Sequence, residues 1–335
     1  MNKIRIGILS PSEIATRRFL PALGGSAEFV GMAVADKSEW AGEIGDDAFR
    51  AINEKEREKA AAILEKFGGR LFESYGALIN SPDVDAVYAP LPPALHFRWG
   101  MTALNAGKHV LLEKPLTVDL EDTKKLLSAA REKDLLIYEN FAFEFHKQIE
   151  RIKEIVASGT LGEIRQIRAS FGFPYRGARD FRYEKSLGGG AVNDCGGYPI
   201  KLASVLLGKT IKTTFAKLGS SRRHNVDTYG TAAFVNDEGT VAITSFGMDN
   251  TYKCELEIWG SKNTLLAPRV FTPPADFETQ LIVTGEDPQE IRVEPDDYFK
   301  NSIDRFIRYT SGDKETIYEQ ILLQNELMES VRREL

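Results

Sequence analysis

Lys114 is placed where it could hydrogen-bond a reacting oxygen atom. It follows Leu111, Leu112 and Glu113 at the end of a predicted strand, and Pro115 stops that strand. A lysine at the carboxyl end of a buried strand can hold a substrate hydroxyl or carbonyl group and assist a proton transfer. The alternative is an ordinary surface lysine at a strand end.

Asp194 and Tyr198 form a second candidate group, in the glycine-rich stretch 186–208. They are four residues apart, so they share one face of a helix if that helix begins early. A phenol is a plausible proton donor to a carbonyl that receives a hydride, and a carboxylate can orient the phenol or a sugar. So much glycine allows a backbone to approach a ligand closely. The alternative is a glycine-rich helix entrance with a buried, hydrogen-bonded tyrosine.

The N-terminal loop could hold a dinucleotide. A strand over 5–9 and a helix over 13–23 flank it, and Ser10, Ser12 and Ala15 stand where a dinucleotide fold has G-x-G-x-x-G/A. Serine hydroxyls and the helix N-terminus, with Pro11 and Ile14 in the same turn, could bind phosphate. An ordinary strand-to-helix turn is the alternative.

Asp36 follows the second predicted strand, at 29–36. An acid at this point can hold a ribose 2′-hydroxyl, which favours NAD. Lys37 could instead meet a 2′-phosphate, so NADP stays open. Asp36 could also simply cap the next helix.

These residues need a scaffold of two domains. Residues 1–140 alternate short apolar strands with helices, which predicts a parallel sheet covered on both faces, and residues 141–335 contain several consecutive strands, which predicts an open, mostly antiparallel sheet. The expected fold class is therefore α/β: an N-terminal dinucleotide-binding domain and a C-terminal α+β domain. The site should lie between the domains, at the carboxyl ends of the parallel strands.

Composition narrows the class of protein further. The net charge of −6 and the lack of a basic face argue against nucleic-acid binding. No apolar run is long enough to span a membrane, and the chain begins directly with a strand. Two cysteines make no disulfide framework, and four scattered histidines make no metal site. We expect a cytoplasmic protein without a metal.

Several motifs in order along the chain resemble the glucose–fructose oxidoreductase / inositol dehydrogenase family (Gfo/Idh/MocA). They are RIGILSPSEIA (5–15), VYAPLPPALH (87–96), EKPL (113–116), ENFAFEFH (139–146), GTLGEIR (159–165), LGGGAVNDCGGYPI (187–200) and GSKNTLLAPRVFTPP (260–274). The resemblance implies a Rossmann domain that binds NAD or NADP, followed by a domain whose open sheet often mediates oligomers. The RRFLPAL and ENF segments look most like sugar-nucleotide 3-ketoreductases and xylose or dihydrodiol dehydrogenases.

The resemblance also implies roles for single residues. Lys114 matches the family's catalytic lysine, Tyr198 its acid/base and Asp194 the acid one turn earlier. The residues expected to contact the cofactor are Ser10, Pro11, Ser12, Ile14, Asp36, Lys37, Leu91, Pro92, His96, Glu113 and Lys114. Those expected to contact the substrate are Lys114, Tyr175, Arg176, Arg182, Asp194 and Tyr198. Arg182 could hold a diphosphate or form a salt bridge with Asp180.

Three features depart from the family pattern. Ser10 replaces the first glycine of the loop, Pro93 stands where an asparagine is usual, and the charged stretch 41–63 is longer than expected and reads as an exposed helix.

The sequence thus predicts an NAD(P)-dependent oxidoreductase that interconverts a secondary alcohol and a ketone on a sugar or nucleotide-linked sugar. We expect it to form a homo-oligomer, a dimer or a tetramer. The alternatives are a non-catalytic NAD(P)-binding sensor, which the altered loop would suit, and a dehydrogenase of free pentoses or cyclic diols. Retention of both Lys114 and Tyr198 favours an enzyme, because a sensor needs no proton donor.

Overall fold

The computed structural model describes residues 3–40, 42–177 and 180–334. Ala41, at the start of the charged stretch, and residues 178–179 of the predicted substrate loop lie outside the described residues. The chain forms two compact units, Met1–Asn140 with Ser302–Ile321 and Phe141–Asn301 with Leu322–Leu335. The sequence assigned everything after residue 140 to the second domain, whereas Ser302–Ile321 packs with the first unit. The functional division between the two domains stays a prediction.

The first unit is built on a sheet of six parallel strands. These are β1 (Arg5–Leu9), β2 (Glu28–Ala33), β3 (Arg70–Phe72), β4 (Ala86–Ala89), β5 (His109–Glu113) and β6 (Ile137–Asn140), in the spatial order β3-β2-β1-β4-β5-β6. Every residue of β4 and β6 is buried, as a sheet covered on both faces requires. This strand order is that of a Rossmann fold. The predicted dinucleotide-binding fold is confirmed.

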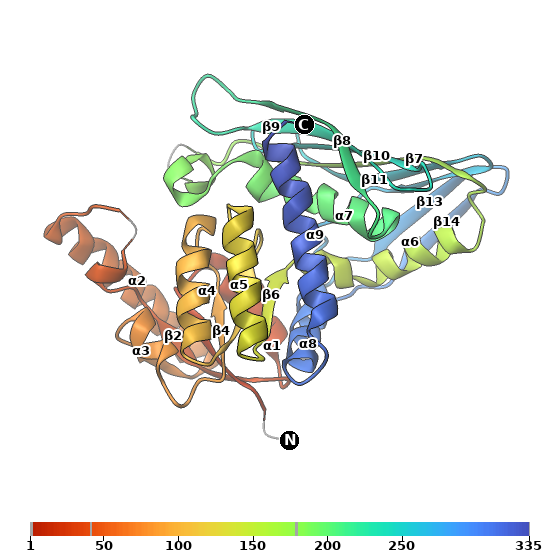
Figure 1. The fold of residues 1–335 in the computed structure, drawn as a ribbon. Coiled ribbons are helices and arrows are strands. Elements are labelled where there is room, and N and C mark those ends of the chain that lie inside the picture. The colour runs from red at the N-terminus through yellow and green to blue at the C-terminus, as the bar shows by residue number, and fades with distance from the viewer. Residues whose placement is uncertain (1–2, 41, 178–179, 335) are drawn as a thin grey trace. The chain divides into compact units, whose positions relative to one another are not determined.

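Helices connect these strands (Figure 1). They are α1 (Leu20–Leu23), preceded by a π-helical turn at Ala15–Phe19, α2 (Asp46–Phe67), α3 (Tyr75–Ile79), α4 (His96–Asn105) and α5 (Leu120–Glu132). The charged stretch forms most of α2, in which only Ala60 and Ile63 are buried. It is an exposed helical addition, as its composition indicates. Two C-terminal helices, α8 (Tyr298–Thr310) and α9 (Glu315–Arg332), each contain residues of both units.

The second unit contains an eight-stranded sheet. Its strands are β7 (Ile164–Gly172), β8 (Lys212–Gly219), β9 (Tyr229–Val235), β10 (Val241–Gly247), β11 (Lys253–Gly260), β12 (Asn263–Ala267), β13 (Thr279–Gly285) and β14 (Gln289–Val293). Their spatial order is β14-β13-β12-β11-β7-β10-β9-β8. The β7–β10 pair is parallel, and the other neighbouring pairs are antiparallel. The predicted open, mostly antiparallel sheet is confirmed.

One face of this second sheet is covered by helices, α6 (Lys147–Ala157) and α7 (Gly197–Leu207), which Figure 1 shows on the same side. Alternate strand residues face them: in β10, Ala242, Thr244 and Phe246 are buried, while Val241 and Ile243 are half-buried. Helix α7 packs on β7 and β10. The core of the unit therefore lies between α7 and the sheet.

Candidate functional site

The carboxyl edge of the parallel sheet gathers the residues predicted to bind a cofactor. Ser10 directly follows β1, Leu91 comes two residues after β4, and Lys114 directly follows β5. The strand order reverses between β1 and β4, and open parallel sheets bind ligands at such a switch point. The sheet therefore brings these loops to one edge of the first unit.

The serine loop takes the shape that a glycine usually provides. Ser10 has a φ of 78°, and its backbone N–H donates to the carbonyl oxygen of Ala33 (3.0 Å). The hydroxyl of Ser12 accepts from the N–H of Ala15 (3.2 Å) and so caps the following helix. A left-handed φ is unfavourable for serine, so the turn is kept at some cost in free energy.

Asp36 caps a short helix, which was the alternative role considered for it. One of its carboxylate oxygens accepts from the N–H and hydroxyl of Ser38 (both 2.7 Å) and from the N–H of Glu39 (3.1 Å). The hydrogen bond from the Ser38 hydroxyl is the main cause that lowers the pKa of Asp36. Lys37 forms an ion pair with Asp46. The other oxygen of Asp36 has no hydrogen bond among residues 3–40, 42–177 and 180–334.

His96 has a structural position. Its ring is fully buried, with Nδ1 2.8 Å from the carbonyl oxygen of Pro115 and Nε2 2.8 Å from that of Leu91. Burial lowers the pKa of His96, although these carbonyls favour the protonated ring. The ring therefore joins the loop after β4 to the loop after β5, and its predicted contact with a cofactor would have to come from neighbouring backbone.

Glu113 forms a hydrogen-bond network next to Lys114. The hydroxyl of Tyr88 (2.7 Å) and the side-chain amide of Asn140 (2.8 Å) both donate to its Oε1, and the hydroxyl of Ser302 donates to Asn140 (2.9 Å). Burial raises the pKa of Glu113, while these hydrogen bonds and Lys114 oppose the change. The network fixes the end of β5, which carries Lys114.

Sequence reasoning missed most of this network. Asn140 pairs with Glu113 in the β5–β6 register, so the neighbouring ends of two predicted parallel strands could have revealed it. Ser302 lies far away in the sequence, and no local signal points to it.

In the second unit, Asp194 is held by Arg182. The guanidinium Nε donates to Asp194 (2.8 Å), and the NH1 donates to Asp180 (3.1 Å). Burial opposes the charge on Arg182, but the two carboxylates raise its pKa above the ordinary value. The salt bridge to Asp180 considered from the sequence is present, so two acids already engage the guanidinium that was predicted to hold a diphosphate.

Tyr198 lies on α7, four residues after Asp194. Its helix begins early, because a π-helical turn at Val192–Gly196 precedes α7. The ring of Tyr198 is surrounded by aromatic rings, whose centroids lie between 4.9 and 5.9 Å from its own: Phe141, Phe143, Phe171 and Phe271. These contacts fix the direction of the phenol relative to the helix.

The glycine run before this helix lets protein groups come close to the backbone. Gly190 has a φ of 125°, and a Cβ there would collide with the carboxylate of Asp227. That carboxylate accepts from the N–H of Val192 (2.8 Å), and burial raises the pKa of Asp227. The glycines therefore form the entrance of a helix, and this entrance positions Asp194 and Tyr198.

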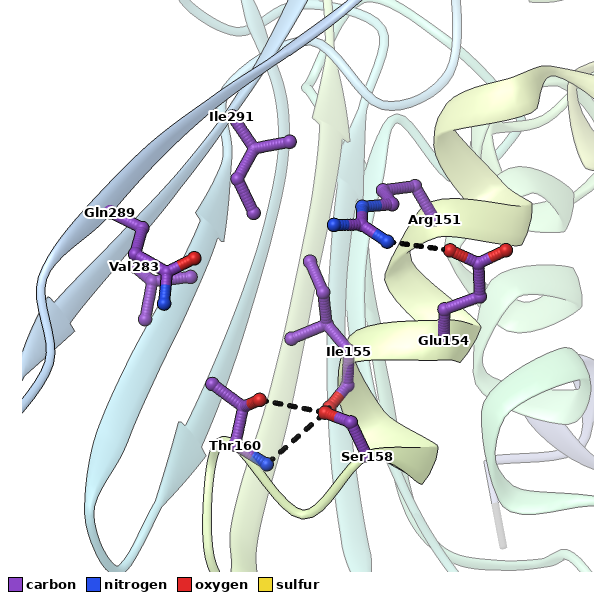
Figure 2. Close-up of a pocket in the computed structure, with 8 residues that line it drawn as sticks. All are labelled: Arg151, Glu154, Ile155, Ser158, Thr160, Val283, Gln289 and Ile291. Atoms are coloured by element: carbon purple, nitrogen blue, oxygen red, sulfur yellow. Dashed lines mark hydrogen bonds and ion pairs between the residues drawn. The ribbon is translucent and has the colours of Figure 1, made fainter.

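A cavity of about 180 Å³ lies elsewhere in the second unit, between α6 and the β13–β14 hairpin (Figure 2). Ile155, Val283 and Ile291 line it together with an ion pair between Arg151 and Glu154 (2.7 Å). No residue predicted from the sequence to bind cofactor or substrate lines it. It carries no part of the candidate site.

The described residues form neither a metal-binding cluster nor a membrane-spanning helix. Among them, no three or more histidine, cysteine, aspartate or glutamate side chains are arranged to hold a metal ion. None of the helices formed by these residues has the length and apolar character to cross a membrane.

Two family models match the chain. Residues 23–141 match a model of the oxidoreductase family with an NAD-binding Rossmann fold, and residues 149–266 match the GFO/IDH/MocA C-terminal domain. The chain belongs to the GFO/IDH/MocA family. It is an NAD(P)-dependent oxidoreductase, which confirms the predicted family, enzyme class and cofactor.

Curated relatives cover nearly all of the chain. A dTDP-3,4-didehydro-2,6-dideoxy-alpha-D-glucose 3-reductase of Actinomadura kijaniata is 38% identical, over 99% of this chain and 95% of that protein. A protein of the same name from Streptomyces violaceoruber is 40% identical over 87% of this chain and 80% of its own length. A D-xylose 1-dehydrogenase (NADP(+)) of Haloferax volcanii is 30% identical over 77% of this chain and 80% of its own.

Solved structures of related proteins share the fold over nearly the whole chain. KijD10, a 3-ketoreductase from Actinomadura kijaniata in complex with NADP and TDP-benzene, is 36% identical with a TM-score of 0.89, covering 99% of this chain and 98% of its own. Variants of KijD10 with one lysine or one tyrosine replaced have also been solved. In KijD10 those two residues are separated by the same number of positions as Lys114 and Tyr198 here.

Proposed function

We propose that this enzyme reduces a ketone on a nucleotide-linked sugar to a secondary alcohol, or runs the reverse reaction. The observation that carries the proposal is the pair Lys114 and Tyr198. Both residues occur in the family's motifs, and their separation equals that of the lysine and tyrosine replaced in the 3-ketoreductase KijD10. The resemblance to dTDP-sugar 3-reductases over nearly the whole chain supports the substrate class.

Side chains of this protein would hydrogen-bond the reacting oxygen of the substrate and transfer its proton. In the reductive direction Tyr198 donates a proton to the oxygen as the carbon gains a hydride, and in the oxidative direction it takes the proton back. Lys114 hydrogen-bonds the same oxygen and stabilises the negative charge that develops on it. Asp194, held by Arg182, orients a neighbouring hydroxyl group of the sugar.

The first unit fits a dinucleotide. Backbone N–H groups in the first turn of a helix lack partners within that helix, and Ser12 begins such a turn at the switch point of the sheet. When bound, the nicotinamide supplies or accepts the hydride. Ser10, Pro11, Ser12 and Ile14 would hold the phosphates, Asp36 and Lys37 the adenosine ribose, and Leu91, Pro92 and Glu113 the nicotinamide side. The second oxygen of Asp36, which can accept from a ribose hydroxyl, slightly favours NAD.

We also propose a homo-oligomer, a dimer or a tetramer, formed through the outer face of the second sheet. That face carries incompletely buried apolar residues, including Ile243 and Leu266, and Trp259 is 53% exposed. A second copy of the chain would bury them. Sedimentation velocity should give a mass of two or four chains, and Ile243→Lys should shift it toward one. A wild-type monomer at micromolar concentration contradicts this proposal.

Substitution of the two central residues tests the proposed reaction. We expect Tyr198→Phe and Lys114→Met each to lower kcat about 10²–10⁴-fold, because each removes a group that assists proton transfer. The measurement is NAD(P)H consumption with a dTDP-linked ketosugar, together with NAD(P)H affinity from fluorescence.

Tyr229→Phe is the matched control, because it removes a phenol hydroxyl from an exposed strand residue and should leave kcat unchanged. Wild-type turnover by both variants would refute the assigned roles. Tight NAD(P)H binding without turnover of any sugar or nucleotide sugar would instead favour a sensor.

A further inference from the structure

Three rings in the second unit pack together outside the residues discussed for proton transfer. Tyr183 and His224 are stacked, with ring centroids 4.4 Å apart and an interplanar angle of 27°. Tyr175 lies 4.9 Å from Tyr183 and 5.6 Å from His224. We call these three residues the aromatic group. Two come from the loop after β7 and one from the loop between β8 and β9, so distant parts of the sequence meet here.

The aromatic group is rigid at its base and open at one ring. The hydroxyl of Tyr183 donates to the carbonyl oxygen of Met248 (2.6 Å) and accepts from the N–H of Arg176 (3.3 Å), and its ring is only 7% exposed. Tyr175, in contrast, is 36% exposed. The Nε2 of His224 is buried and has no hydrogen-bond partner in the described part of the chain. A planar ligand could therefore stack on Tyr175 without disturbing the rings below it.

Three arginines are sequence neighbours of the aromatic group. Arg222 and Arg223 immediately precede His224 in an exposed turn, and Arg176 follows Tyr175 with its guanidinium 4.6 Å from the centre of the Phe173 ring. None of these three arginines forms an ion pair within residues 3–40, 42–177 and 180–334.

The acids near Tyr183 do not balance this charge. Asp180 is engaged by Arg182, and Asp249 is the other carboxylate whose charge acts on Tyr183. The arginines therefore remain available for an anion, unlike Arg182.

We propose that the nucleoside diphosphate part of the substrate binds here, with its base stacked on the aromatic group and its phosphates held by Arg222 and Arg223. This inference rests on the proposed function, because it requires a nucleotide-linked sugar as substrate. Aromatic side chains provide stacking surfaces for bases. A guanidinium group can donate two parallel hydrogen bonds to two oxygens of one phosphate. The β8–β9 loop would then recognise the nucleotide, while Lys114 and Tyr198 act on the sugar.

Binding of dTDP, thymidine and NADPH to the full-length protein tests the inference by calorimetry. Tyr175→Ala and His224→Ala should weaken dTDP and thymidine about tenfold, since stacking stabilises a bound base by ~1–3 kcal/mol. The double variant Arg222→Ala with Arg223→Ala should weaken dTDP about tenfold or more, barely change thymidine, and reduce the dependence of dTDP affinity on salt. NADPH affinity should stay at the wild-type value in each variant.

Two further variants serve as controls. Tyr175→Phe keeps the ring and should bind dTDP like the wild type, and Arg168→Ala removes an exposed arginine from the outer face of the sheet. Wild-type dTDP affinity in the Ala variants, with turnover of a dTDP-sugar intact, would overturn this inference and leave the proposed function standing. A wild-type protein that binds NADPH but neither dTDP nor any nucleotide sugar would overturn the substrate class, and this inference with it.

Discussion

Several side chains at the candidate site are engaged with other protein groups rather than open to a ligand. Asp36 caps a helix, His96 joins two loops, and Arg182 bridges two acids. The type and position of each residue were compatible with binding a ligand. A sequence does not show which protein groups lie within hydrogen-bond distance of a side chain in the folded chain. The sequence alternatives for Asp36 and Arg182, a cap and a salt bridge, describe what the structure contains.

The buried carboxyl group of Glu113 should make the stability of the folded protein depend on pH. Burial raises the pKa of Glu113 above 4.5 in the folded protein. The protonated carboxyl group therefore stabilises the folded state below about pH 4.5, and this contribution is lost as the pH rises through the pKa of the folded protein. Glu113→Gln keeps an acceptor for Tyr88 and Asn140 but cannot ionise. We expect the variant to gain stability relative to the wild type as pH rises from 4.5 to 8, measured by urea unfolding.

Glu290→Gln controls for the loss of one carboxylate, because Glu290 is an exposed residue of the edge strand β14. Parallel stability curves for wild type and Glu113→Gln across this pH range would contradict a buried, titrating Glu113.

At the level of elements, the sequence predicts most of the fold because local patterns encode it. The alternation of apolar strands and helices up to residue 140 was sufficient to predict the parallel sheet. The consecutive strands that follow were sufficient to predict the second sheet. The strands β12 and β14 were missed: each has five residues, and β14 is a polar edge strand that lacks a buried pattern. The π-helical turns before α1 and α7 have no sequence signature that we used.

The glycine entrance to α7 gives a prediction about an element. Gly190→Ala places a Cβ against the carboxylate of Asp227 and retains a φ that favours glycine, so it should cost about 2–4 kcal/mol of folding free energy. Gly208→Ala, at the other end of α7, has a φ of +79° with open space around the added Cβ and should cost about 1 kcal/mol. Chemical denaturation of both variants measures the difference. Equal losses would show that Asp227 does not closely contact this turn.

At the scale of the whole molecule, the first unit depends on the C-terminal part of the chain. Phe306 is fully buried and packs edge-on against Tyr138, while Glu315 accepts two hydrogen bonds from Arg131. Nothing in the sequence pattern of α8 indicates this association, because amphipathic helices pair with any matching apolar surface. That is why the predicted boundary left residues 302–321 in the second domain.

Phe306→Ala therefore tests the composition of the first unit. Loss of this buried ring should cost about 3–5 kcal/mol of folding free energy. NAD(P)H binding should be lost at a lower temperature than in the wild type, because the loops proposed to hold the cofactor belong to the same unit. Ile52→Ala, at a position 38% exposed on α2, should change stability by less than about 0.5 kcal/mol. Thermal unfolding with and without NAD(P)H gives both values, and similar melting temperatures for the two variants would contradict the assignment.

The chain passes from one unit to the other three times, after Asn140, after Asn301 and after Ile321. During synthesis, the ribosome releases the six parallel strands long before it releases the helices that complete their unit. The surface that Phe306 covers in the folded protein therefore stays exposed on the nascent sheet until residues 302–321 have been made. Slowing translation between the codons for residues 140 and 321 would lengthen the time for which that surface stays uncovered.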